Sequence, residues 1–138
     1  MSLFDVFDIA GSGMSAQSMR LNLTSSNIAN ANTVSGNEDE AYSARHPVFS
    51  AMLKDRFAPT EQGVGVNMLG VIESDAEHVI RYEPNNPIAN EEGYVFDSNV
   101  DTAEEMANMI SASRSYQNNI EILNTSKEML LRTLRLGE

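Results

Sequence analysis

Residues 101–137 read DTAEEMANMISASRSYQNNIEILNTSKEMLLRTLRLG, the longest uninterrupted helical repeat in the chain. Asp101 stands where a helix N-cap is expected, and Glu104 follows three residues later as in a capping box. No proline or glycine occurs before Gly137, which stands where a glycine commonly follows a helix. At about 1.5 Å per residue, the pattern predicts one helix from 101 to 136, about 50 Å long.

Along this stretch, positions spaced alternately by three and four residues form one line on the predicted helix. Most of them are large and apolar, which is the pattern of a helix that packs along another helix. The line consists of Met106, Met109, Ser113, Tyr116, Ile120, Leu123, Lys127, Leu130 and Leu134. We interpret Tyr116 as a packing anchor with its hydroxyl at a rim, and Lys127 as a register or solubility device or an outward-pointing residue.

The start of the chain repeats the same spacing. It predicts a helix from about Leu3 to Ala29, capped by Ser2 with Asp5 three residues on. The line consists of two alternating rows. One row has large residues (Phe7, Met14, Leu21, Ile28), whereas the other continues after Phe4 with small residues (Gly11, Ser18, Ser25). Small residues would let a neighbouring helix approach closely. Gly11 and Gly13 each cost a helix about 1 kcal/mol relative to Ala, so this helix depends on packing for stability.

The segment between the two helices is rich in turn signals. Residues 32–40 predict a mobile loop, and residues 83–93 a turn-rich connector. Residues 64–72 and 78–82 have strand patterns, and 73–77 would join them as a short hairpin. Residues 42–53 fit a strand or a helix equally.

Together these patterns predict a mainly α fold. Long N- and C-terminal helices form a coiled-coil-like helical hairpin, with a small β-hairpin and loop insertion between them. The predicted divisions are an N-terminal helix (1–30), a loop and short-strand region (31–100) and a C-terminal helix (101–138). Because a two-helix hairpin leaves much of each apolar line uncovered, the sequence indicates partners.

Composition excludes several classes of function. The 20 acidic and 9 basic residues give a net charge of −11, and no segment is basic. Nucleic acid and anionic membrane surfaces are therefore poor partners. No apolar stretch approaches the roughly 20 residues of a membrane span, so no membrane insertion is expected. The first residues lack the basic region of a cleaved secretory signal. The absence of cysteine excludes disulfides and thiolate chemistry.

No group of residues has the spacing of a catalytic, metal or cofactor site. His46 and His78 lie 32 residues apart, with no cluster of His, Asp and Glu at metal-ligand spacing. The acidic run 38–40 is interpreted as a solvated loop, because paired carboxylate catalysis needs a fixed geometry. Residues 63–65 lack the Lys-Ser/Thr of a phosphate loop. We therefore expect no enzyme activity, no cofactor and no metal.

Three stretches carry a resemblance to a known family. Residues 25–33 (SSNIANANT) resemble the Asn-(Leu/Ile)-Ala-Asn signature near the start of bacterial flagellar axial proteins. Residues 99–134 resemble the closing helix of the same proteins, and residues 82–95 (YEPNNPIANEEGYV) resemble the segment before it. The Met-Ser-Leu-Phe start and the length agree as well. The chain thus resembles the bacterial flagellar basal-body rod proteins, in particular the short proteins of the proximal rod.

The resemblance implies a structural role. Such proteins are exported unfolded by the flagellar type III apparatus, without a cleaved signal, and form a rod that spans the periplasm and transmits torque. Implied partners are further copies of the chain, other rod subunits and the adaptor protein between rod and export gate. The residues expected at subunit interfaces are Phe4, Phe7, Met14, Leu21, Asn27, Ile28, Asn30, Met106, Met109, Tyr116, Ile120, Leu123, Leu130 and Leu134.

Some of these residues allow two interpretations. Asn27 and Asn30 can adopt left-handed backbone geometry or bond to nearby backbone and so fix how the chain leaves the helix, or they are ordinary helix-end asparagines. The methionines at 14, 106, 109 and 129 are interpreted as core filling in preference to an adaptable binding surface.

Two other classes of function compete with the structural one. A soluble cytosolic coiled-coil module, acting as a chaperone or regulator, would use the same apolar lines. It would fold and dimerise fully in dilute solution, whereas low helicity of the free chain by circular dichroism favours a subunit that orders on assembly. A small hydrolase would need an ordered acidic pocket in the middle segment.

Overall fold

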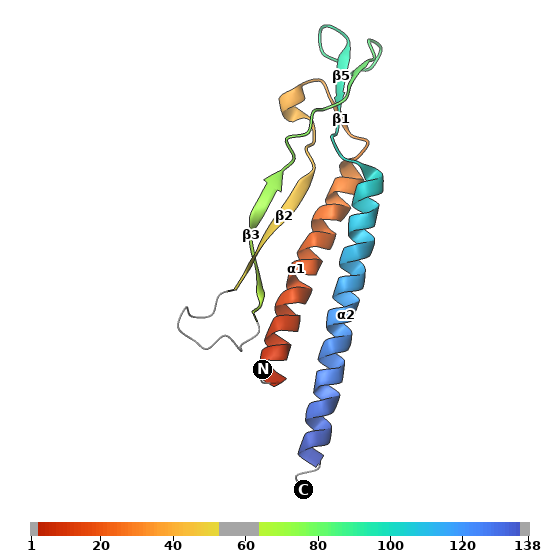
Figure 1. Ribbon diagram of the computed structural model, residues 1–138. Coiled ribbons are helices and arrows are strands. Elements are labelled where there is room, and N and C mark those ends of the chain that lie inside the picture. The colour runs from red at the N-terminus through yellow and green to blue at the C-terminus, as the bar shows by residue number, and fades with distance from the viewer. Residues whose placement is uncertain (1–2, 53–63, 136–138) are drawn as a thin grey trace.

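Two long antiparallel helices dominate the molecule (Figure 1). The computed structural model describes residues 3–52 and 64–135. Helix α1 spans Leu3–Asn30 and helix α2 spans Thr102–Arg135, and they lie side by side. Between them come β1 (Val34–Ser35), a 3-10 turn η1 (Glu38–Glu40), β2 (Arg45–Ala51), β3 (Val66–Glu73), β4 (Ile80–Tyr82) and β5 (Tyr94–Asp97). The predicted arrangement of terminal helices around a small β insertion is confirmed.

The start of α2 has the predicted cap. The Asp101 carboxylate oxygen Oδ1 accepts the backbone N–H of Ala103 at 2.8 Å and that of Glu104 at 3.2 Å. These bonds satisfy two amides that have no partner within the helix. The predicted cap at Ser2 and the glycine at 137 lie outside the described residues.

The face of α2 that packs on α1 matches the predicted line at every second position only. The matching positions are half-buried: Met109, Tyr116, Leu123 and Leu130. The remaining contact positions are Glu105, Ala112, Asn119 and Ser126, where Met106, Ser113, Ile120 and Lys127 were predicted. Ala112 is 0% exposed, whereas Met106 is 53% exposed. Small residues such as Ala112 and Ser126 let the helix axes approach, and Met106 and Ile120 remain exposed.

Helix α1 shows the same inversion. Its buried side chains are Ala10, Ala16, Thr24 and Asn27. The predicted large row is only half-buried, and Phe4 is exposed. The glycine that approaches α2 is Gly13, where a Cβ would lie 2.9 Å from Asn119 Nδ2. The predicted small row faces no neighbour within the subunit: a Cβ at Gly11 would meet no described atom within 4 Å, and Ser18 and Ser25 are exposed.

The predicted hairpin between residues 64–72 and 78–82 is wrong. Strand β3 pairs antiparallel with β2, and β4 pairs with β5 in a three-stranded sheet ordered β1-β5-β4. The segment after β3 cannot fold back, because Asn99 Nδ2 donates to the carbonyl oxygens of Ser74 and Ala76. Strand pattern alone identifies strands and not their partners.

Two further segments of the middle region have a defined structure. Residues 42–53, which fitted strand or helix, contain strand β2 in their described part, and a bulge opposite Val48–Phe49 leaves Leu69 of β3 unpaired. Residues 32–40 are not the mobile loop predicted, because Val34–Ser35 pairs with β5 and Asn37 caps η1. Gly36 allows this course, since a Cβ there would lie 2.2 Å from the Ile88 carbonyl oxygen.

Replacing Ala112 by leucine should destabilise the subunit. Ala112 is fully buried between the helices, so extra methylene groups would separate them at a cost of about 1–3 kcal/mol. The measurement is urea unfolding of the purified chain followed by circular dichroism. Ser111→Leu, on an exposed position of the same turn, is the control and should change the free energy of unfolding by less than about 0.5 kcal/mol. Equal effects would contradict the assigned packing face.

Candidate assembly interface

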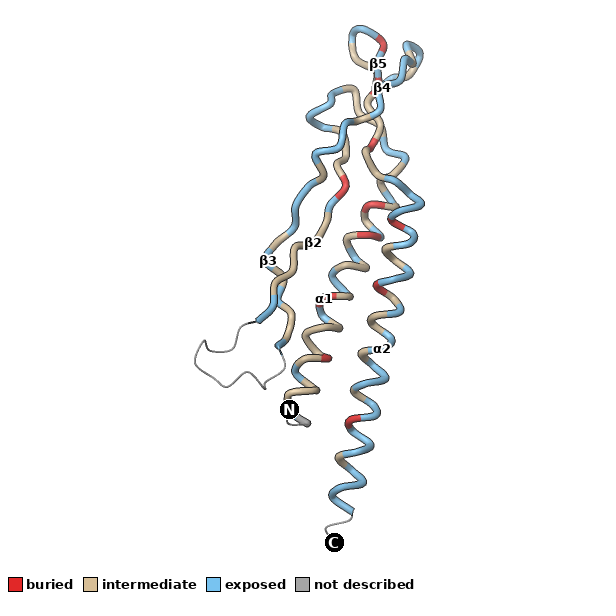
Figure 2. The backbone as a smooth tube through the Cα atoms, viewed as in Figure 1, coloured by how far each residue is buried: buried red, intermediate tan, exposed pale blue. Residues whose placement is uncertain are grey.

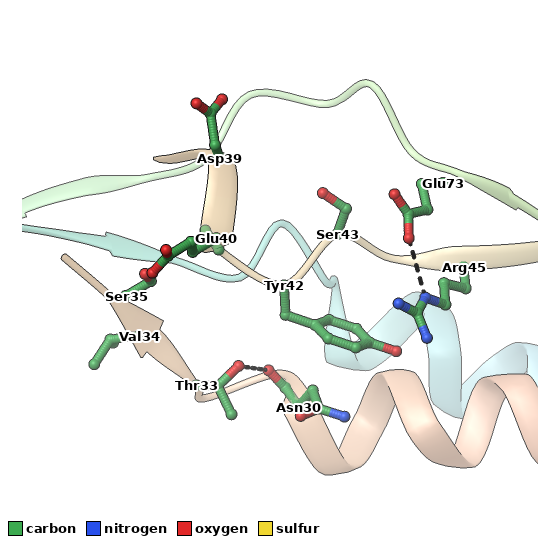
Figure 3. Close-up of a pocket in the computed structure, with 11 residues that line it drawn as sticks. Asn30, Thr33, Val34, Ser35, Asp39, Glu40, Tyr42, Ser43, Arg45 and Glu73 are labelled. Carbon is green, nitrogen blue, oxygen red and sulfur yellow. Dashed lines mark hydrogen bonds and ion pairs between the residues drawn. The ribbon is translucent and has the colours of Figure 1, made fainter. Parts of the chain in front are cut away.

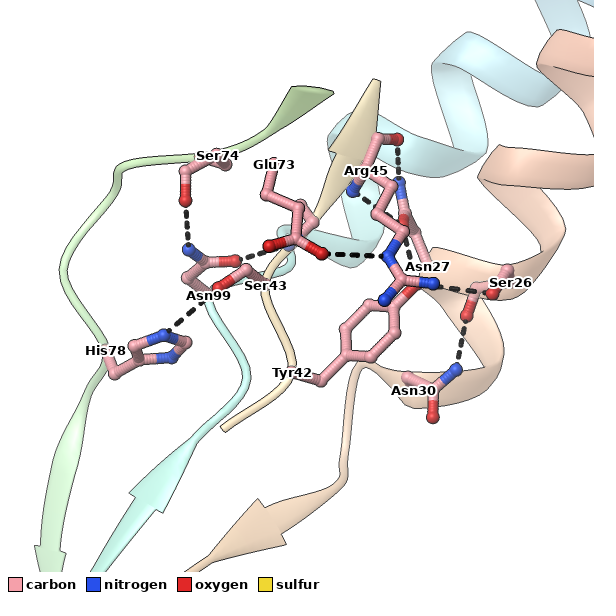
Figure 4. Close-up of polar contacts among 11 residues, drawn as sticks. Ser26, Asn27, Asn30, Tyr42, Ser43, Arg45, Glu73, Ser74, His78 and Asn99 are labelled. Atoms are coloured by element: carbon pink, nitrogen blue, oxygen red, sulfur yellow. Dashed lines mark hydrogen bonds and ion pairs between the residues drawn. The ribbon is translucent and has the colours of Figure 1, made fainter. Parts of the chain in front are cut away.

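A buried asparagine joins the first helix to the β region. Asn27 on α1 is 1% exposed. Its Nδ2 donates to the Arg45 carbonyl oxygen and its Oδ1 accepts the Arg45 backbone N–H, both at 2.9 Å. Oδ1 also accepts the Tyr42 hydroxyl at 3.0 Å (Figure 4). The side-chain amide therefore acts on the first residue of β2 as a neighbouring strand would, and it fixes where β2 begins beside α1.

A second asparagine holds the preceding residue in the same way. Asn99, in the link between β5 and α2, accepts the Ala44 backbone N–H through Oδ1 at 2.7 Å. Its Nδ2 donates to the Ser74 and Ala76 carbonyl oxygens at 3.2 and 2.9 Å. The two side chains together tie the end of α1, both β2 and β3, and the start of α2 to one point. We call Asn27 and Asn99 the asparagine clasp.

Asn30 fixes how the chain leaves α1, which agrees with one of the two interpretations of its role. Its Nδ2 donates to the Ser26 carbonyl oxygen four residues earlier at 2.8 Å. Its own carbonyl oxygen accepts both the backbone N–H and the hydroxyl of Thr33, at 3.1 and 2.7 Å. These bonds satisfy carbonyls at the helix end. Asn27 instead bonds to backbone that is distant in sequence, so it is more than a helix-end residue.

Much of α2 is exposed (Figure 2), and four of its exposed apolar residues lie on one side of the helix, with Ser113, Gln117, Asn124 and Glu128 between them. We call Met106, Ile110, Ile120 and Leu131 the outer stripe. At about 100° per residue, these positions lie within about 80° of one another. Met106 and Ile110 are 53% and 55% exposed. Met129 is also exposed, so core filling is wrong for Met106 and Met129 within the subunit.

The predicted interface residues fall into three groups in the isolated subunit. Four are exposed, one is buried and the rest are half-buried. The exposed residues are Phe4, Met106, Ile120 and Leu134; Asn27 is buried; Phe7, Met14, Leu21, Ile28, Asn30, Met109, Tyr116, Leu123 and Leu130 are half-buried. Sequence reasoning missed Ile110 and Leu131, because it took interface residues of α2 only from the main apolar line. The signal available was large apolar residues off the main line.

A second exposed apolar area lies on the small sheet at the end of the molecule. Tyr82 pairs with Tyr94 across β4 and β5, and their rings meet edge-on at 5.2 Å. Ile80, two residues before Tyr82, lies on the same face, and all three side chains are exposed. Gly93, just before β5, has a φ of +84°, and a Cβ there would lie 3.0 Å from the Tyr82 ring. The opposite face buries Val95 completely.

Several titratable side chains make contacts within the subunit. His78 Nδ1 lies 2.8 Å from the Asp97 carbonyl oxygen, and its Nε2 lies 3.4 Å from the Ser43 hydroxyl. Arg81 pairs with Asp97 and Glu83, and Arg45 pairs with Glu73. Within residues 3–52 and 64–135, no three His, Asp or Glu side chains are grouped so as to hold a metal ion. In the same residues no helix is long and apolar enough to cross a membrane.

Replacing Asn27 by alanine should unfold the junction. The Arg45 backbone N–H and carbonyl would lose their partners, at a cost of about 2–3 kcal/mol. Asn22→Ala, an exposed asparagine on the same helix, is the matched control and should change the free energy of unfolding by less than about 0.5 kcal/mol. Urea unfolding distinguishes the two variants. A small effect at Asn27 would mean that water replaces its bonds and that the clasp is unimportant.

Comparison with known proteins agrees with the architecture. Residues 7–36 match the family model of flagella basal body rod proteins, and residues 91–136 match the model of the C-terminal region of flagellar basal body rod FlgEFG proteins. The chain is 50% identical to the flagellar basal-body rod protein FlgC of Salmonella typhimurium strain LT2. It is 49% identical to that of Escherichia coli O157:H7 and 37% identical to that of Buchnera aphidicola subsp. Baizongia pistaciae. Each alignment covers the whole of both chains, so the chain belongs to the family of flagellar basal-body rod proteins FlgC.

Proposed function

We propose that the chain is a structural subunit of the proximal rod of the flagellar basal body and that it assembles through α1 and α2. The observation that carries this proposal is the outer stripe of α2, four exposed apolar side chains on one side of a helix in an acidic chain. Family membership supports a structural role and not a catalytic one. The partners are other copies of the chain and other rod subunits.

The distribution of small and large residues supports assembly through the helices. Within the subunit, Ala112 and Gly13 lie where α1 and α2 approach closely, and the large apolar side chains of the outer stripe remain exposed. Exposed apolar residues in a line along a helix mark a contact with another helix. In the rod, neighbouring helices would cover the outer stripe of α2 and the open row around Gly11 in coiled-coil-like packing.

The asparagine clasp suits a part that carries load. A drive shaft transmits torque only if its parts cannot rotate against one another. Asn27 and Asn99 bind consecutive residues at the start of β2 through backbone bonds, so a force on the β region passes directly to both helices. Because each subunit would contact its neighbours through different surfaces, the assembly extends as an open helix.

The proposal includes the route by which the chain reaches the rod. The subunit would pass through the flagellar type III apparatus and span the periplasm as part of the rod, with the adaptor protein between rod and export gate as a neighbour. Helices that gain much of their stability from neighbours suit a chain that travels unfolded and orders where it assembles.

Charge placed on the outer stripe should block assembly without unfolding the subunit. Ile110→Glu with Ile120→Glu changes two side chains with at least partial exposure, so the free energy of unfolding should fall by less than about 1 kcal/mol. Incorporation of the variant into isolated basal bodies, read by immunoblot, should be lost. Asn118→Glu, an exposed position about 120° from Met106 around the helix, should incorporate normally. Normal incorporation of the double variant would contradict the proposal.

Gly11→Ala should have opposite effects on the subunit and on the rod. The added Cβ has open space in the subunit and improves helix propensity, so the isolated chain should become about 1 kcal/mol more stable. If a neighbouring helix approaches at Gly11, the same methyl group lowers incorporation into basal bodies. A variant that is more stable and assembles fully would show that no helix packs at this position.

A further inference from the structure

The two ends of the molecule carry opposite charge. The last turns of α2 project past the start of α1 (Figure 1), and residues 127–135 there contain Lys127, Arg132 and Arg135 against one acidic residue, Glu128. Residues 34–40 and 74–97, near the other end, contain nine acidic residues and one arginine. The basic end also exposes Leu131 and Leu134. The helix dipole explains cations in a last turn but not large apolar side chains beside them.

The acidic region contains a pocket of about 420 Å³ between the end of α1, β1, η1 and the start of β2 (Figure 3). Asp39 and Glu40 stand on one wall, and Glu73 faces them across the pocket with Arg45 already paired to it. Among the described residues, neither Asp39 nor Glu40 has an ion-pair partner. The apolar parts of the lining come from Val34, Ala41 and the Tyr42 ring.

We propose that this pocket receives the basic C-terminal end of a helix from an adjoining rod subunit, of the kind that residues 127–135 of α2 present. The charges are complementary: two unpaired carboxylates meet a helix end with clustered Lys and Arg. The chemistry is complementary as well, because exposed leucines next to those cations can cover the apolar wall. Within one molecule the two ends are too far apart to meet (Figure 1), so the contact joins different subunits head to tail.

Peptide binding tests the proposal. The probe is residues 122–135 as a fluorescein-labelled peptide, titrated with the purified full chain and followed by fluorescence anisotropy. Asp39→Lys with Glu40→Lys should weaken binding roughly tenfold or more, because attraction becomes repulsion. Added salt should weaken binding to the unchanged chain. Glu91→Lys with Glu92→Lys is the matched control, since it reverses two adjacent exposed acidic residues outside the pocket. This variant should bind nearly as tightly as the unchanged chain.

A charge swap identifies the pairing. A peptide with Arg132→Glu and Arg135→Glu should bind the unchanged chain poorly and regain affinity for the Asp39→Lys, Glu40→Lys chain. Equal loss in both acidic variants would mean attraction to overall negative charge and would overturn the pocket assignment. Absence of binding to a chain that circular dichroism shows to be helical would overturn it too.

The inference rests on the proposed function, yet the two can fail separately. The peptide assay reports on the pocket alone, whereas incorporation of the Ile110→Glu, Ile120→Glu chain into basal bodies reports on the outer stripe. Failure of the peptide to bind, together with loss of incorporation in the stripe variant, would refute the pocket and leave the rod function in place.

Discussion

The architecture depends on the bonds between the Asn27 side chain and the backbone of Arg45. A helix and a strand that meet at an angle cannot satisfy each other's backbone groups, and a buried amide side chain solves this problem by offering one donor and one acceptor. Once Arg45 is held, Ala44 lies within reach of Asn99, and Asn99 in turn holds the segment after β3. The β region, the exit of α1 and the entry to α2 are thereby fixed by two residues.

Much of the fold could be predicted from the sequence, because its helices are encoded locally. The absence of proline and glycine from the second helix, its Asp101 cap and the spacing repeated in both predicted the two helices within a residue or so. Strand partners depend on bonds between residues distant in sequence, so the hairpin from 64 to 82 was predicted wrongly. The register of the helix contact failed for a physical reason: large residues were assumed to lie inside, whereas Ala112 and Gly13 permit closer packing.

The wrongly predicted register of the helix contact also bears on the candidate interface. In a monomeric protein, Met106 and Ile110 would be expected to lie inside and alanine outside. In this chain Ala112 is buried in the contact within the subunit, whereas Met106 and Ile110 are exposed. A motif was enough to suggest a role for Asn27, but nothing in the local sequence indicates that its partner is Arg45. The acidic run at 38–40 is exposed, as its interpretation as a solvated segment predicted, but its place beside a pocket depends on η1 and β1 and could not be predicted.

The central claim is that the terminal helices are the assembly element, and a deletion experiment in cells tests it most directly. Chains lacking residues 3–20 or residues 118–136 are expressed in a strain without the natural gene. Complete rods are counted by electron microscopy, and export of later axial proteins is measured. We expect either deletion to stop rod completion although the shortened chain is still synthesised. Normal rods from both deleted chains would contradict the claim and would assign assembly to the β region.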